Sequence, residues 1–335
     1  MRIGACRPRQ KAVVAVSDSG LPFSRAGSLI SEAPGEHWLF EGLWGRTAIG
    51  LIGGAPKCCK SWLGLELAVA LASGTDALDH FPVAAQGPAL VFLAEDALPQ
   101  VKERIEALCR HRGVAIEALD LFVITAPSLR IDQQGDQERL AMTIESVKPR
   151  LLVLDPLVRL HALDENSAGE ISGLLSYIRG LQRRFDLAIA IVHHSSKKQR
   201  AQPGQALRGS SDLHAIGDSN VYLARKDDGI QMTIEHRAAR PPDPMMIELV
   251  TELDGAIHLA VRGGGSAEDR GRSLDERIIE MLAQAGSTLS RTEMRARLRV
   301  NNQKLGDALA RLEQAGRVHR GERGWELKLS VHKTW

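Results

Sequence analysis

Cysteine and aromatic residues are scarce in this sequence, and the charges of its side chains almost cancel. Its 335 residues include four cysteines and 4% aromatic residues, and the formal net charge is +2. Cys6, Cys58, Cys59 and Cys109 lack the spacing of metal ligands, and the adjacent Cys58 and Cys59 would form only a strained disulfide. The sequence therefore excludes a disulfide scaffold and a chain-wide positive field, so any basic surface for nucleic acid must be local.

Long apolar runs are also missing. No stretch reaches the length that a membrane-spanning helix needs, and the run Ala12–Val16 is too short for a secretory signal. We therefore expect a cytoplasmic protein without membrane contact. A hydrophobic content of 44% is enough for a substantial core, and the length of the chain suggests about two domains.

The most informative pattern is a strand, a loop and a helix near residue 54. The apolar run Thr47–Ile52 leads into Gly54-Ala-Pro-Lys-Cys-Cys-Lys-Ser61, which opens a helical run. This order is typical of a phosphate-binding loop, in which backbone N–H groups and a helix N-terminus hold a phosphate. Lys60 would neutralise phosphate oxygens of ATP, and the Ser61 hydroxyl would bind Mg²⁺. The residues predicted to bind ATP are Gly54, Ala55, Pro56, Lys57, Cys58, Cys59, Lys60, Ser61 and Trp62.

One residue departs from the usual form of this loop. Glycine normally precedes the lysine, and this sequence has Cys59 there. If the position needs a strained backbone conformation, a side chain costs about 1–3 kcal/mol. Because Lys60, Ser61 and the strand–helix context are intact, we still expect nucleotide binding, although a displaced lysine would slow hydrolysis. The alternative is an ordinary loop before a core helix.

Two further apolar runs end in carboxylates. The first ends at Asp155, which is the Walker B pattern, and we predict that Asp155 and Ser61 hold Mg²⁺. The second ends at Glu95 and Asp96. We expect Glu95, with Asp96 as the alternative, to orient and deprotonate the attacking water. The simpler explanations are that Asp155 caps the next turn and that Glu95 is a solvated loop residue.

A third apolar run, Leu187–Val192, leads into His193 and His194. A polar residue at the end of such a strand can contact the γ-phosphate and report its presence to the loop that follows. The alternative is local hydrogen bonding where the strand ends. We expect no zinc site there, because cysteines and suitably spaced histidines are missing.

Strand-like and helical runs alternate from residue 47 onward. Val/Ile/Leu strands separated by helices indicate an α/β domain with a mainly parallel sheet covered on both faces. Later β-type runs up to Val261 are expected to extend this sheet. We predict a flexible leader at 1–35, an ATPase domain at 36–262, a linker at 263–273 and a winged-helix domain at 274–329.

The C-terminal segment has the pattern of three helices and a hairpin, which is the outline of a winged helix-turn-helix. Leu274–Ala285 is amphipathic, Ser290-Arg-Thr-Glu293 is a capping box that opens a second helix, and Leu305–Gln314 is the third. Such a unit can place its third helix and its wing on duplex DNA, and the alternative is a protein-docking module. The side chains predicted to contact duplex DNA are Lys304, Arg311, Arg320 and Arg323.

Several motifs follow one another in a defined order. They are Gly54–Ser61, Ala94-Glu-Asp96, Leu154-Asp155 with Asp164-Glu-Asn-Ser-Ala-Gly169, His193-His-Ser-Ser-Lys197, and Arg208-Gly-Ser-Ser211. The set resembles the RecA-like ATPases of the RepA type, the hexameric replicative helicases of broad-host-range plasmids and their relatives on mobile elements, over residues 36–262. The resemblance implies a RecA-like fold, a homo-oligomeric ring of six subunits, ATP bound between subunits and single-stranded DNA in the central channel.

The resemblance also implies roles for individual residues. Glu95 would be the catalytic carboxylate, Asp155 the Walker B acid and His194 the γ-phosphate sensor. These helicases tend to carry an arginine finger after the Arg-Gly-Ser-Ser motif, but the stretch directly after that motif lacks arginine here. The neighbouring candidates are Arg208, Arg225, Arg237 and Arg240. We expect Arg240 or Arg237 to act as the finger across a subunit interface, and both could instead be solvated charges.

A basic segment directly after the sensor strand is the predicted contact with single-stranded DNA. Residues 195–208 carry basic side chains among Ser, Gln, Gly and Pro, with no apolar anchor. In the helicase interpretation this segment projects into the channel and binds backbone phosphates. The alternative is a surface loop that binds nothing. The predicted contacts are Lys197, Lys198, Arg200 and Arg208.

The sequence leaves three functions open. The first is an ATP-driven, ring-forming DNA motor. The second is a slow or non-hydrolysing regulator or loader that uses ATP occupancy to assemble on DNA, which Cys59 and the missing finger favour. The third is a small-molecule P-loop kinase, against which the lack of an arginine-rich lid and the predicted winged helix argue.

Overall fold

The computed structural model describes the central part of the chain and most of the C-terminal unit. The described residues are 23–29, 37–165, 167–194, 211–226, 229–262, 274–285, 288–298, 302–321 and 324–328. Most of the predicted leader and the whole predicted linker lie outside them. The same holds for Lys197, Lys198, Arg200, Arg208 and Arg323.

A nine-stranded sheet lies at the centre, with the strand order β11-β10-β9-β8-β3-β7-β6-β4-β5. Neighbours from β8 to β5 in this order pair in parallel, and neighbours from β8 to β11 are antiparallel. The strands are β3 Ile49–Gly54, β4 Ala89–Leu93, β5 Leu121–Val123, β6 Leu151–Asp155, β7 Ala188–His194, β8 Ser219–Lys226, β9 Gly229–His236, β10 Met245–Thr251 and β11 Ile257–Val261. The prediction that the later strands extend a mainly parallel sheet is confirmed.

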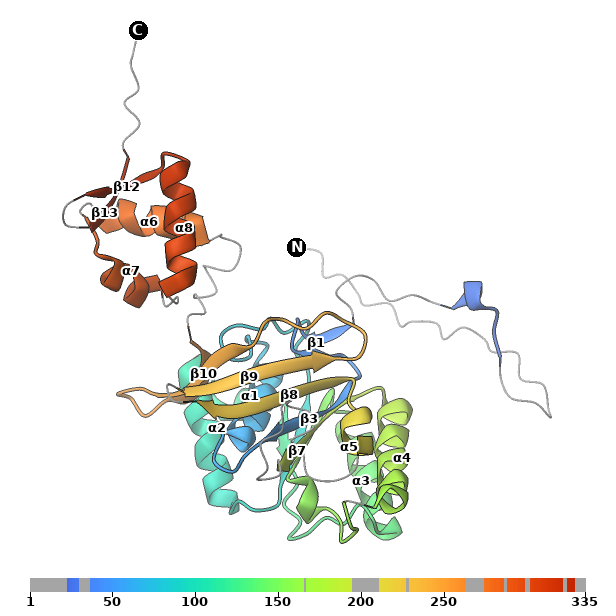
Figure 1. Cartoon of the computed structure of the whole chain (residues 1–335). Helices are drawn as coiled ribbons and strands as arrows, with labels where there is room; N and C mark the ends of the chain where they lie inside the picture. Colours follow the sequence, from blue (N-terminus) through green and yellow to red (C-terminus); the bar gives the residue numbers. More distant parts are fainter. Residues whose placement is uncertain are drawn as a thin grey trace, which may run out of the picture.

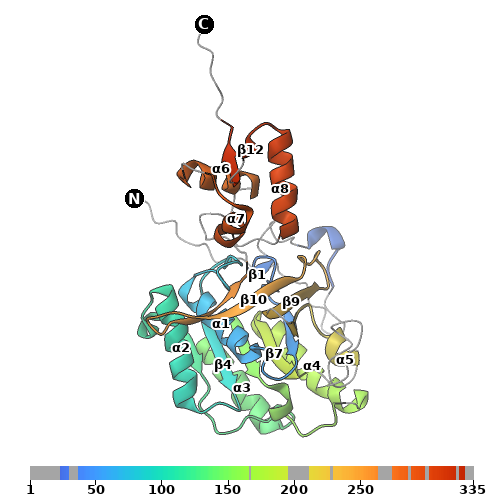
Figure 2. The ribbon, with the colours of Figure 1, turned by 60° about the vertical axis from the view of Figure 1, so that its left-hand side comes forward.

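Helices cover both faces of the sheet, with α2 and α4 on opposite sides of β4 and β7 (Figure 2). The helices of this part are α1 Lys60–Ser73, α2 Leu98–Arg112, α3 Gln134–Val147, α4 Ala168–Phe185 and α5 Ser211–Ala215. The helices α1 and α2 pack into one hydrophobic cluster, and α3 and α4 pack into another. The predicted α/β fold class, with helices flanking a mainly parallel sheet, is therefore confirmed. No helix in the described ranges is long and apolar enough to cross a membrane.

The strand β7 shows why its sequence is an unbroken apolar run. Ala190 and Val192 join the cluster on one face, and Ile189 and Ile191 join the cluster on the other. Successive side chains of a strand point to opposite faces, so a strand covered on both sides has no polar position. Its pairing with β3 continues to His194 opposite Gly54. The strand therefore ends two residues later than the apolar run indicates.

Glycine follows the last residue of two of the helices. Gly74 follows α1 with φ 73°, and Gly113 follows α2 with φ 62°. Both are left-handed conformations that glycine adopts without steric cost. Before β3, the short strands β1 (Trp38–Phe40) and β2 (Trp44–Gly45) pair with each other and bury Trp44 in the cluster around α1.

The C-terminal unit contains three helices and a two-stranded hairpin in its described residues (Figure 1). Its elements are α6 Leu274–Ala285, α7 Arg291–Leu298, α8 Asn302–Gln314, β12 Val318–Gly321 and β13 Gly324–Leu327. The unit has its own hydrophobic cluster. The capping box before α7 is present, because the Glu293 N–H donates to Ser290 Oγ at 3.2 Å and the Ser290 N–H donates to Glu293 Oε2 at 2.8 Å. The winged-helix assignment and the domain boundaries stay predictions.

Candidate functional site

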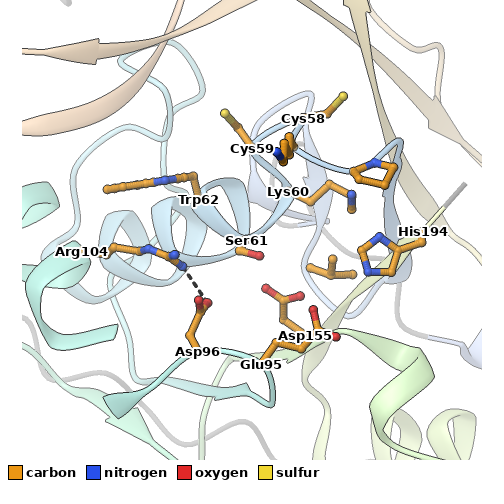
Figure 3. Close-up of a pocket in the computed structure, with 13 residues that line it drawn as sticks. Cys58, Cys59, Lys60, Ser61, Trp62, Glu95, Asp96, Arg104, Asp155 and His194 are labelled. Atoms are coloured by element: carbon orange, nitrogen blue, oxygen red, sulfur yellow. Dashed lines mark hydrogen bonds and ion pairs between the residues drawn. The ribbon is translucent and has the colours of Figure 1, made fainter. Parts of the chain in front are cut away.

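The predicted phosphate-binding loop connects β3 to α1 and borders a cavity of about 450 Å³. Figure 3 shows Lys60, Ser61, Asp155, Glu95 and His194 around this cavity. They come from the loop and from the carboxyl ends of β4, β6 and β7, which lie at one edge of the sheet. The full lining is Pro56, Lys57, Cys58, Cys59, Lys60, Ser61, Trp62, Glu95, Asp96, Arg104, Asp155, Val192 and His194.

The strand β8 fixes the start of the loop. Gly54 lies opposite Leu223, and a Cβ at Gly54 would come within 2.5 Å of the Leu223 carbonyl oxygen. Only glycine allows this close approach. Further along β8, Arg225 Nη2 donates a hydrogen bond to the carbonyl oxygen of Lys57 at 2.8 Å. The sequence did not predict this contact of Arg225 with the loop.

The backbone of Cys59 is strained in the way that the sequence anticipates. Cys59 has φ 59° and ψ 25°, a left-handed conformation, directly before α1. A side chain in this conformation costs roughly 1–2 kcal/mol. The helix begins regularly all the same, because the Leu63 N–H donates to the Cys59 carbonyl oxygen at 2.9 Å. The loop therefore tolerates the missing glycine at a cost in stability.

We expect Cys59→Gly to stabilise the protein by about 1 kcal/mol, because glycine adopts positive φ without the Cβ penalty. Thermal unfolding measures the gain. Cys59→Ala is the matched control, since it removes the thiol but keeps the Cβ, and it should give no comparable gain. Equal stability of the two variants would contradict the strain explanation.

Lys60 lies within the loop and is nearly buried, at 5% exposure. Its Nζ donates to the Ala55 carbonyl oxygen at 2.8 Å, so the ammonium is held at the loop. Burial lowers the pKa of Lys60, while the nearby Cys58 and Asp155 act to raise it. The ammonium thus lies where it would meet an anion held by the loop backbone.

Asp155 ends β6 and lies beside Ser61. Its side chain is hydrogen-bonded to the Ser61 hydroxyl, and burial raises the pKa of Asp155 from 3.8 to about 6. A hydroxyl and a carboxylate are the oxygen ligands that Mg²⁺ binds beside a nucleotide. The residues predicted to hold the metal are therefore adjacent.

The raised pKa of Asp155 predicts a pH-dependent stability. A carboxyl group whose pKa is raised by folding stabilises the fold fully below its unfolded value of 3.8, and this contribution disappears as the pH rises through about 6. We therefore expect Asp155→Asn to raise the stability of the nucleotide-free protein by about 1–3 kcal/mol at pH 8 and much less at pH 4. Thermal unfolding of both proteins across this range tests it. A difference that does not change with pH would contradict the prediction.

The end of β4 presents two carboxylates, both held by arginines. Asp96 Oδ2 accepts a hydrogen bond from Arg104 Nη1 at 2.6 Å, and Glu95 Oε1 accepts one from Arg159 Nε at 2.8 Å. Asp96 is therefore engaged beside Trp62, whose ring lies 5.7 Å from the Arg104 guanidinium carbon. Glu95 is the more exposed of the two and faces the cavity, as Figure 3 shows. Glu95 is thus the more accessible of the two carboxylates, and its role as the base stays a prediction.

Only one of the two adjacent histidines lines the cavity. His194 borders it, whereas His193 is not part of the lining and has its Nδ1 3.9 Å from Glu165 Oε1. The alternation of side chains along β7 explains this difference. His194 also lies opposite Gly54 in the neighbouring strand. The histidine predicted as the γ-phosphate sensor is therefore the one at the loop.

The structure does not bring the two finger candidates to this cavity. Arg237 and Arg240 follow β9, which is antiparallel to β8 and ends with His236 paired to Ser219, at the end of β8 away from the loop. Arg237 Nη1 lies 3.2 Å from Asp218 Oδ1. An arginine finger acts on a neighbouring subunit, so the role stays a prediction.

Most of the residues predicted to contact DNA are not among the residues that the structure describes. The single-stranded DNA contacts and Arg323 lie outside the described residues, as does the side chain of Lys304. Arg311 Nη2 donates to Asp275 Oδ1 at 2.8 Å, and Arg320 is exposed on β12. These roles remain predictions.

The residues of the cavity fit Mg²⁺-bound ATP. Gly54 lets the loop start close to β8, Lys60 supplies a positive charge, and Ser61 and Asp155 supply adjacent oxygen ligands. The positive end of α1, at Lys60, completes an environment that favours a phosphate group.

Comparisons with known proteins place this site in a wider group. A family model described as an AAA domain matches residues 15–200. Among solved structures, the chain is similar to a KaiC-like protein of the hyperthermophilic archaeon Pyrococcus horikoshii OT3, at 12% identity over 66% of this chain and 93% of that one, with a TM-score of 0.45. It is also similar to the RadB recombinase, at 13% identity over 64% of this chain and 90% of that one, with a TM-score of 0.45.

Proposed function

This chain belongs to the AAA domain family and is a nucleotide-binding P-loop ATPase, and we propose that it is a DNA-associated motor that hydrolyses Mg²⁺-bound ATP. The observation that carries the proposal is the meeting of Lys60, Ser61, Asp155 and Glu95 around one cavity. Lys60 serves the phosphates, Ser61 and Asp155 serve the metal, and Glu95 serves the attacking water. A structural role alone gives no reason for all four to lie together.

In this proposal the loop holds the phosphates. Backbone N–H groups between Gly54 and Ser61 bind phosphate oxygens, and Lys60 exchanges its bond to Ala55 for the β- and γ-phosphate oxygens. Ser61 and Asp155 hold Mg²⁺, which when bound neutralises the charge that develops on those oxygens.

Glu95 prepares the nucleophile. A water molecule attacks the γ-phosphorus, the bond to the β–γ bridging oxygen breaks, and Glu95 accepts the proton that the water loses. Arg159, which contacts Glu95 at 2.8 Å, holds the carboxylate at the mouth of the cavity. His194 donates a hydrogen bond to the γ-phosphate, and cleavage removes this bond.

In the proposal, the loss of that hydrogen bond couples hydrolysis to the binding of single-stranded DNA. His194 ends β7, and the basic segment at 195–208 follows it directly. Lys197, Lys198, Arg200 and Arg208 bind the phosphates of single-stranded DNA in the proposal, and their position changes when His194 loses its partner. A ring of six subunits, with Arg240 or Arg237 reaching the neighbouring ATP, completes the motor.

An ATPase assay with and without single-stranded DNA tests the proposal. We expect DNA to stimulate hydrolysis several-fold in the wild type but not in a Lys197→Ala/Lys198→Ala/Arg200→Ala variant. A Lys102→Ala/Arg139→Ala variant is the control, because both side chains are exposed on helices outside the cavity. Hydrolysis that DNA does not affect in the wild type would refute the DNA-associated motor.

The strained Cys59 supports a second function, a regulator or loader that binds ATP and turns it over slowly. In that case ATP binding, rather than hydrolysis, controls assembly on DNA. The wild type would bind Mg²⁺-bound ATP without DNA-stimulated turnover, and Cys59→Gly would raise the turnover sharply. Strand displacement by the wild type would exclude this alternative.

A further inference from the structure

A cluster of two histidines and two carboxylates lies outside the nucleotide cavity. His111 is in the last turn of α2, and His258 is in β11 at the edge of the sheet. Asp79 lies in the loop after α1, and Glu252 follows β10 directly. None of the four lines the cavity beside the phosphate-binding loop. The cluster is therefore a separate feature that the ATPase does not account for.

The two imidazole rings are stacked and share both of their carboxylate partners. Their centroids are 3.4 Å apart and their planes differ by 7°. On one side, Asp79 Oδ2 lies 3.0 Å from His111 Nε2 and 3.7 Å from His258 Nε2. On the other side, Glu252 Oε1 lies 3.2 Å from His111 Nδ1 and 3.6 Å from His258 Nδ1.

We propose that Asp79, His111 and His258 bind a divalent transition metal ion of the zinc type. One donor atom from each of these residues lies within 4.8 Å of the others. A tetrahedral zinc ion with bonds of about 2.0–2.1 Å keeps its ligand atoms about 3.3–3.4 Å apart. The Asp79–histidine distances of 3.0 and 3.7 Å lie on either side of that value. Because the two rings are parallel, one imidazole must turn out of the stack for both Nε2 lone pairs to reach one ion. Two histidines and one carboxylate leave a fourth position for water.

Glu252 supplies a carboxylate that can accept the second N–H of each histidine, as is usual at zinc sites with histidine ligands. Histidines that bind metal through one nitrogen nearly always donate the other N–H to a carboxylate or a carbonyl. Glu252 lies at the Nδ1 atoms of both rings, while Asp79 lies at both Nε2 atoms. This arrangement favours one tautomer for both histidines, with each Nδ1–H on the Glu252 side of the stack and each Nε2 lone pair on the Asp79 side.

The burial of His258 also points to a ligand. His258 is 4% exposed, and its Nδ1 is buried without a hydrogen bond to any described residue, 3.6 Å from Glu252. A buried polar nitrogen without a partner is costly, and a metal at Nε2 would polarise the ring and draw this N–H towards the carboxylate. The Asp79 side chain is 49% exposed, so the ion can enter from solvent.

A shared proton is the competing explanation of the cluster. Asp79 raises the pKa of His111 mainly through their hydrogen bond, whereas burial lowers the pKa of His258. Arg112 faces the cluster and opposes positive charge on both rings. One protonated histidine stacked on a neutral one would give Asp79 a hydrogen-bond donor. It would leave His258 Nδ1 buried without a hydrogen bond to any described residue.

The site would join α2 to the edge strand of the sheet. His111 and His258 belong to elements that pack together, and Asp79 adds the loop that follows α1. An ion bound only by the folded chain raises its thermal stability in proportion to the logarithm of the free metal concentration. A structural role of this kind does not depend on the nucleotide site.

The experiment uses the full chain, stripped with chelator, dialysed and kept free of nucleotide. Zn²⁺ titration should raise the Tm, and metal analysis after dialysis should find one zinc per chain. Co²⁺ should give the intense absorption of a four-coordinate site. His258→Ala should weaken Zn²⁺ binding at least 100-fold, and Glu252→Gln roughly 10–100-fold. His319→Ala is the control and should bind Zn²⁺ as the wild type does.

Two results would overturn the proposal. One is a wild type that retains no zinc and whose Tm does not change with Zn²⁺, which would leave the shared proton as the explanation. The other is Zn²⁺ binding that is equal in the wild type and in Glu252→Gln and His258→Ala. If His258→Ala does not fold, the wild-type titration, the Co²⁺ spectrum and Glu252→Gln decide the question.

Discussion

Lys60→Met is expected to lower the rate of ATP hydrolysis by about 10²–10³-fold, because it removes the positive charge that faces the developing phosphate charge. The Nζ of Lys60 is held at the loop by the Ala55 carbonyl oxygen, 2.8 Å away. Methionine keeps much of the shape of the side chain but cannot neutralise an anion. A steady-state phosphate-release assay at saturating Mg²⁺-bound ATP measures the effect.

Lys102→Met is the matched control for this variant. Lys102 has a 69% exposed side chain on α2 and does not line the cavity. The Lys102→Met variant should hydrolyse ATP at the wild-type rate. A Lys60→Met variant that is as active as this control would show that the loop does not carry the reaction.

Glu95→Gln is expected to reduce kcat by about 10²–10⁴-fold while leaving nucleotide binding nearly unchanged, because it removes the proton acceptor and keeps the shape of the side chain. Glu95 is half exposed and contacts Arg159, so the substitution should not alter the Tm appreciably. Single-turnover hydrolysis and the fluorescence of a labelled ATP analogue separate the two effects.

Asp96→Asn is the informative companion of Glu95→Gln. Asp96 is engaged with Arg104 at 2.6 Å, so this substitution should disturb the wall of the cavity near Trp62 and reduce kcat much less. If Asp96→Asn proves the more damaging of the two, the roles of the carboxylates are reversed.

The sequence predicts the main parts of the cavity because they stand at the ends of buried strands. Apolar runs mark β3, β6 and β7, and their carboxyl ends lie at one edge of a parallel sheet. Lys60, Asp155 and His194 therefore meet at one cavity although they are far apart in the chain. The strain at Cys59 was also predictable, since only the residue type differs from the usual motif.

Other features depend on register and packing, which local patterns do not encode. Arg225 contacts Lys57 only because β8 pairs with β3 so that Leu223 lies opposite Gly54. Arg104 reaches back from α2 to Asp96 over a separation of eight residues, a contact that no local motif marks. The strand β7 runs past its apolar part because its backbone pairing with β3 continues.

The sequence does not reveal the histidine cluster for the same reason. His111 and His258 lie in separate motifs with no regular spacing, and they meet because β11 is the edge strand that packs against α2. Sequence spacing reveals a metal site only when the ligands are neighbours in the chain. A long-range contact prediction would have been the only signal.

Calorimetric titration of Mg²⁺-bound ATP into the protein tests the central claim most directly. A triphosphate held by the backbone of residues 54–61 and by the Lys60 ammonium should give saturable binding with one site per chain, in the range from about 1 μM to 1 mM. Lys60→Met should weaken it, and Lys102→Met should not. Heats that never saturate at millimolar nucleotide, or equal binding by Lys60→Met, would contradict the account.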